Sequence, residues 1–125
     1  MGLPDQYDDR IDLPESRRRI IKMLGNNTAA PTKTFGAGVA LTRTGVGDYK
    51  ATFNENPGVY VGVAGYSFES ATATDVKGYT CTVKSYDSTN FVVEFLVFNS
   101  SFAAADLNAQ SIVLEILFKR TQVSG

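Results

Sequence analysis

The chain has 125 residues, a formal net charge of −1, no histidine and a single cysteine. This length suits one compact domain, and the balanced charge gives no basic excess for nucleic-acid binding. The lack of histidine removes a Ser-His-Asp triad and most catalytic metal sites, and the sequence contains no apolar run of about 18 residues that would predict a membrane span.

The N-terminal part of the chain contains the one segment that predicts a helix, over residues 13–24. Asp12 is placed as an N-cap with Glu15 three residues later as a capping box, and Gly25 stands where a helix stop belongs. An incomplete apolar stripe along this helix is formed by Leu13, Ile20, Ile21 and Leu24.

A helix of about twelve residues is too short to be stable alone in water, so its stripe must rest on its own domain or on a partner. Its charge is segregated, with an acidic start followed by Arg17, Arg18, Arg19 and Lys22. A well-capped surface helix explains part of this pattern. We predict an N-terminal arm over 1–33, comprising the helix and a linker, followed by a β domain over 34–125.

The rest of the chain predicts an all-β domain. Six alternating or apolar runs are separated by turn residues: 35–43, 48–54, 59–68, 79–86, 91–98 and 111–120. Six strands without intervening helices favour an antiparallel β-sandwich, jelly-roll-like, and the pattern does not choose between sandwich and jelly-roll topology. The long connection over 99–110 could hold a short helical turn at 103–107.

The last two runs are apolar on both faces, where a strand with one wet face would alternate cleanly. The simplest second cover is another subunit, although the arm could provide it within the chain. The outward residues predicted to form an oligomer interface are Val92, Leu96, Phe98, Val113 and Leu117.

The residues give little support for catalysis. Cys81 reads as a buried small apolar residue, because a nucleophilic cysteine would usually need a histidine. Carboxylates within the apparent strands, namely Asp48, Glu69, Glu94 and Glu115, are more simply explained by a solvated face or by salt bridges. We expect no enzyme activity, no cofactor and no metal.

Two stretches resemble a pattern found in virion proteins of tailed bacteriophages. "VALTRTGVGDYKATFNENP" has an apolar-Thr-Arg strand, a Gly-x-Gly turn, a Tyr-x-x-Thr-Phe strand and an Asn/Pro turn. "TNFVVEFLVFNSSFAAADLN" has a Phe-rich strand followed by a polar segment with an aspartate. Over residues 36–120 the chain is similar to β-sandwich domains of tail fibres, head fibres and capsid decoration (cement) proteins.

The resemblance implies a homotrimer on the virion surface, assembled in the host cytoplasm, whose N-terminal arm binds the major capsid protein. Carried onto this arm, the expected capsid-binding residues are Arg17, Arg18, Arg19, Ile20, Ile21 and Leu24. No partnership with nucleic acid or membrane is expected. The alternatives are a receptor- or carbohydrate-binding head of a fibre or spike and, third, hydrolysis by a carboxylate pair.

Overall fold

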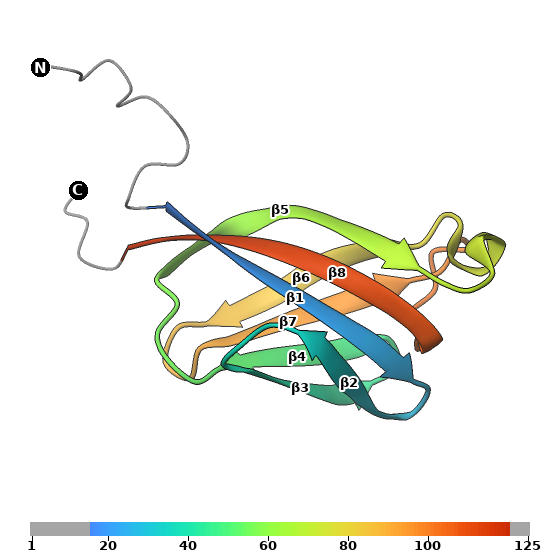
Figure 1. Ribbon diagram of the computed structural model, residues 1–125, viewed down its shortest axis with the longest axis horizontal. Helices are drawn as coiled ribbons and strands as arrows, with labels where there is room; N and C mark the ends of the chain where they lie inside the picture. The colour runs from blue at the N-terminus through green and yellow to red at the C-terminus, as the bar shows by residue number, and fades with distance from the viewer. Residues whose placement is uncertain (1–15, 121–125) are drawn as a thin grey trace, which may run out of the picture.

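The computed structural model describes residues 16–120 (Figure 1). It contains eight β-strands and one short 3-10 helix, η2 (Ala73–Val76). The strands are β1 (Ser16–Asn26), β2 (Ala29–Phe35), β3 (Val39–Gly45), β4 (Asp48–Phe53), β5 (Val59–Glu69), β6 (Thr80–Asp87), β7 (Val92–Phe98) and β8 (Asn108–Lys119). The predicted all-β antiparallel sandwich is confirmed.

The strands form two four-stranded antiparallel sheets that pack face to face. Sheet A has the order β2-β1-β8-β5, and sheet B has the order β3-β4-β7-β6. In Figure 1 sheet A lies in front of sheet B, with β5 over β6 at one edge of the sandwich and β2 beside β3 at the other. The strands at these edges are therefore β2 and β5 in sheet A, and β3 and β6 in sheet B.

The core lies between the sheets and follows from strict alternation along each central strand. In β4, the inward residues Tyr49, Ala51 and Phe53 are buried, while the residues between them are partly exposed. The same alternation in β7 and β8 supplies seven further core residues: Val93, Phe95, Val97, Ile112, Leu114, Ile116 and Phe118. These inward faces were predicted from the period-two pattern.

The predicted helix over 13–24 is wrong for residues 16–24, which form most of β1, while residues 13–15 lie outside the described part. β1 runs between β2 and β8, and Ile21 and Met23 point into the core. Pairing with the long apolar strand β8 satisfies the backbone of β1 and buries these two side chains. Tertiary pairing therefore overrides the weak local helix signals.

The predicted boundary between an arm and a β domain at residues 33 and 34 is also wrong. It falls inside β2, and the expected linker over 28–34 lies mostly within that strand. Residues 16–35 therefore belong to the sandwich. The helical turn expected at 103–107 is absent as well, because Ala104 instead forms an isolated β-bridge with Phe98.

Candidate functional site

An apolar groove of about 430 Å³ lies on the outer face of sheet A. It crosses β2, β1 and β8, and its lining residues are Ile20, Lys22, Leu24, Thr34, Phe35, Ser111 and Val113. Phe35 is 59% exposed and Ile20 is 41% exposed, so two large apolar side chains meet solvent at this groove. The groove offers a partner an apolar surface built on rigid strands.

Two cross-strand ion pairs lie beside this groove on the outer face of sheet A. Arg18 Nη1 lies 3.0 Å from Glu115 Oε2, and Lys22 Nζ lies 2.8 Å from Glu69 Oε1. Both pairs are partly exposed, so each contributes little to stability. The apolar residues of this face therefore lie beside two ion pairs, each with one positive and one negative side chain.

The structure divides the six expected capsid-binding residues among different environments. Ile20 and Leu24 line the groove, and Arg17 is exposed. Ile21 is only 2% exposed in the core, so the prediction that it contacts a partner is wrong. Arg19 lies 4.7 Å from the ring centre of Phe53 and donates a hydrogen bond to Ala37 O, so the chain itself holds this side chain.

The five residues expected at an oligomer interface do not share one surface. Val113 and Leu117 lie on the outer face of sheet A, whereas Val92, Leu96 and Phe98 lie on the outer face of sheet B. All five are partly buried within the single chain. One flat contact cannot include them all, because the whole sandwich lies between the two groups.

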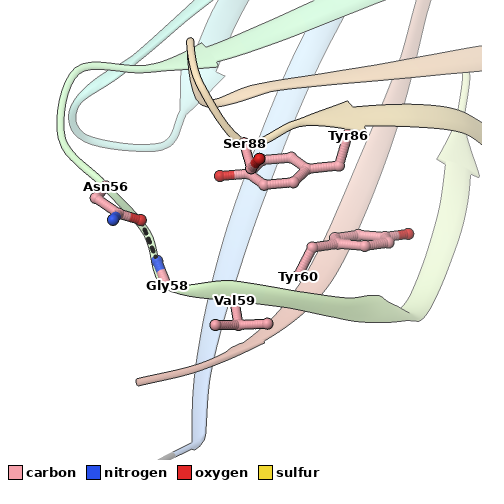
Figure 2. Close-up of a pocket in the computed structure, with 6 residues that line it drawn as sticks. All are labelled: Asn56, Gly58, Val59, Tyr60, Tyr86 and Ser88. Atoms are coloured by element: carbon pink, nitrogen blue, oxygen red, sulfur yellow. Dashed lines mark hydrogen bonds between the residues drawn. The ribbon is translucent and has the colours of Figure 1, made fainter. Parts of the chain in front are cut away.

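A second pocket, of about 320 Å³, lies at the end of the sandwich where β5 begins and β6 ends (Figure 2). It is lined by Asn56, Gly58, Val59, Tyr60, Tyr86 and Ser88. Figure 2 shows the two tyrosine rings lying over one another with their hydroxyls pointing in opposite directions, and their ring centres are 5.5 Å apart. Asn56 Oδ1 accepts a hydrogen bond from Gly58 N and fixes the loop at the pocket's edge.

The tyrosines of this pocket lie in apolar surroundings. Burial raises the pKa of Tyr60. Burial is also the main cause that raises the pKa of Tyr86, and the charge of Asp87 raises it further. Within residues 16–120, the buried Tyr86 hydroxyl has no hydrogen-bond partner. The pocket therefore combines aromatic rings with few polar groups, as small-molecule sites often do.

Sequence reasoning missed a cluster at the opposite end, where three loops meet. Arg43 binds Asp106 through Nε–Oδ1 and Nη2–Oδ2 contacts of 2.8 and 2.9 Å, and Arg43 Nη1 also donates to Thr28 O. Asp106 Oδ1 accepts a further hydrogen bond from Gly47 N. The Thr-Arg strand and the aspartate were both noted in the sequence, but their meeting depends on the fold.

The strand carboxylates form ion pairs on the open sheet faces. Lys84 Nζ lies 3.4 Å from Glu94 and 3.7 Å from Asp48 on the outer face of sheet B. Glu69 and Glu115 pair with Lys22 and Arg18, as described above. Within the described part of the chain, no three potential metal ligands come together, and no helix is long and apolar enough to cross a membrane.

Burial raises the pKa of the Cys81 thiol to about 12. The side chain lies on the inner face of β6 and packs against the core, as the sequence predicted. A thiol with this pKa is almost entirely protonated at neutral pH and is therefore a poor nucleophile.

Comparison of the chain with protein-family models, with curated proteins and with solved structures finds no match.

Proposed function

We propose that this protein is a structural virion protein that decorates a phage capsid and stabilises it by contacting major capsid proteins. The observation that carries the proposal is the exposed apolar groove on sheet A, with Phe35 and Ile20 at its surface. Exposed apolar side chains that gather in a groove rimmed by polar residues are a common feature of interaction sites. The resemblance of residues 36–120 to decoration and fibre domains is the reason for proposing a capsid as the partner.

The groove would accept an apolar side chain of the capsid surface. Arg17 is exposed near the start of β1, and Arg18 remains exposed although it pairs with Glu115. Both guanidinium groups can therefore also contact carboxylates on the shell. A single contact of this size is weak. Many copies on a closed shell would multiply such contacts as avidity, without an active site.

The test uses capsids assembled without this protein and measures binding of the purified full chain. Phe35→Ala should weaken binding at least about tenfold, because it removes an anchor of the groove. Phe102→Ala is the matched control, since Phe102 is 82% exposed on the β7–β8 connection. Equal binding by both variants and the unchanged protein would show that the groove is not the docking surface.

The tyrosine pocket favours a second candidate function, a receptor- or carbohydrate-binding head of a fibre or spike. Stacked Tyr60 and Tyr86 with Asn56 and Ser88 at the rim could hold a ring-shaped polar ligand such as a sugar. A glycan panel would test this function. Binding that is lost in Ser88→Arg but kept in Phe35→Ala would favour it over capsid decoration.

A further inference from the structure

Among residues 16–120, β5 lies at an edge of sheet A with no neighbouring strand on its outer side. Edge strands usually carry charged residues or proline, because their free backbone groups can otherwise pair with another chain. The other three edge strands carry proline or charged residues: Pro31 and Lys33 in β2, Arg43 in β3 and Lys84 in β6. β5 has no charged residue and no proline from Val59 to Phe68.

The side chains of β5 are also unusually exposed. Val59, Val61, Val63 and Tyr66 are all exposed large apolar residues, and Val61 is 54% exposed. β5 does contain two irregularities in its pairing with β8, beside Val61 and between Val63 and Gly65. Such bulges twist an edge, but here they leave valine rather than lysine at the surface.

The charges at the two ends of β5 indicate what can pair with it. Glu69 ends the strand, whereas Val59 at its start pairs with Lys119 of β8. An antiparallel pair of two β5 strands, centred near Ala64, sets Glu69 of each copy opposite Val59 of the other. One strand, that of Val59 of the second copy, then separates Glu69 from Lys119 of the second copy, a distance that these two long side chains can span. To make this contact Glu69 turns away from Lys22, with which it pairs in the single chain.

We propose that β5 pairs antiparallel with β5 of a second copy of this chain, which joins the two sheets A across a two-fold axis. A parallel pairing would set the two Glu69 carboxylates side by side and repel. The antiparallel pairing separates them by roughly 30 Å over about ten residues. A strongly charged partner, such as nucleic acid, would find no counter-charge along residues 59–68. This inference does not depend on capsid binding, and it puts a dimer in place of the homotrimer that the resemblance implies.

The first test measures the mass of the full chain by sedimentation over a range of concentrations. We expect two chains for the unchanged protein and a dimer Kd at least about tenfold higher for Val61→Lys, because an edge lysine opposes strand pairing. Val46→Lys is the matched control, since Val46 is an equally exposed valine at the β3–β4 turn, 58% against 54%. It should dimerise like the unchanged protein.

A charge swap tests the arrangement and uses variants outside the core. Lys119→Glu should raise the dimer Kd by about threefold to tenfold, given two symmetric pairs. Adding Glu69→Lys to the Lys119→Glu variant should restore most of the dimer affinity, because the pair between the two copies is rebuilt with its charges exchanged. The loss of the pair between Glu69 and Lys22 within each chain does not change this expectation. A mass of one chain or three chains for the unchanged protein would overturn the proposal. Equal effects of Val61→Lys and Val46→Lys, or a double variant weaker than Lys119→Glu, would also overturn it.

Discussion

Arg43 and Asp106 form a two-point ion pair that ties the β3–β4 turn to the β7–β8 connection, 63 residues away in the sequence. Both side chains are largely buried, at 17% and 12% exposed. Asp106 also accepts the backbone N–H of Gly47, whose φ of 64° is the left-handed conformation that glycine adopts easily. A Cβ on Gly47 would lie 2.6 Å from Val97 O, so the turn fits tightly beneath the connection.

Replacing Asp106 with Asn should lower the free energy of unfolding by about 1–3 kcal/mol, because the guanidinium loses its charged acceptor. Urea unfolding at neutral pH would measure the loss. Asp75→Asn is a control, since Asp75 is an exposed residue of η2. Equal stability of Asp106→Asn and the unchanged protein would contradict a role for the pair in holding the loops.

The same pair predicts a pH dependence of stability. The Arg43 guanidinium holds the pKa of Asp106 below its usual value; burial opposes this shift and the Gly47 N–H adds to it. A lowered folded-state pKa means that the contribution is complete above the unfolded pKa of about 4 and is lost as pH falls through the folded value. Between pH 7 and strong acid, the free energy of unfolding should therefore fall less steeply for Asp106→Asn than for the unchanged protein. Parallel curves would refute this assignment.

Ile20 and Ile21 provide a direct test of β1. Ile21→Ala should cost about 2–5 kcal/mol of stability, because it opens a cavity in the core. Ile20→Ala should cost less than about 1 kcal/mol, because Ile20 faces outward and is 41% exposed. Thermal unfolding compares the two variants. Similar small losses at both positions would fit the helix that the sequence suggested and not the strand.

Tyr86 and Tyr49 should respond oppositely to loss of their hydroxyls. Tyr49 Oη accepts the buried Leu107 N–H at 3.0 Å, so Tyr49→Phe leaves a donor unpaired and should cost about 1–3 kcal/mol. The Tyr86 hydroxyl is buried without a partner among residues 16–120, so Tyr86→Phe should be neutral or stabilising. Chemical unfolding of both variants measures the difference. A large loss for Tyr86→Phe would reveal a partner for its hydroxyl.

Cys81 should resist thiol reagents in the folded protein. With its pKa raised to about 12, the thiolate is scarce at pH 8, and the packing against the core limits access. Labelling with a chromogenic disulfide should be slow in buffer and rapid in urea. Fast labelling in buffer, at the rate of the unfolded chain, would contradict the position of Cys81 on the inner face of β6.

The strands after residue 38 could be predicted because each buries one face, so apolar residues recur with period two. β1 hid this signal. Arg19 occupies an inward position of β1, where it lies over the Phe53 ring, and the apolar alternation begins only at Ile21 and Met23. Caps and stops then favoured a helix, although a turn at residues 27–28 between two short runs was a possible hairpin signal.

Gly25 shows why the local reading failed. It was taken as a helix stop, but a Cβ at this position would lie 2.2 Å from Leu107 O. The glycine is needed because a distant segment passes against the backbone, and no local pattern contains that information. The groove on sheet A has the same origin, since Ile20, Phe35 and Val113 come together only through strand pairing.

The position of β1 between β2 and β8 also affects how the protein is made. A ribosome completes sheet B from the hairpins β3–β4 and β6–β7 before it releases β8, yet β1 waits for β8 along almost its whole length. At about 5–20 residues per second, the wait between the synthesis of β1 and the synthesis of β8 lasts several seconds. During that time Ile21 and Met23 lack the neighbouring strand β8 that completes their burial, so slower growth at low temperature or a chaperone should raise the soluble yield.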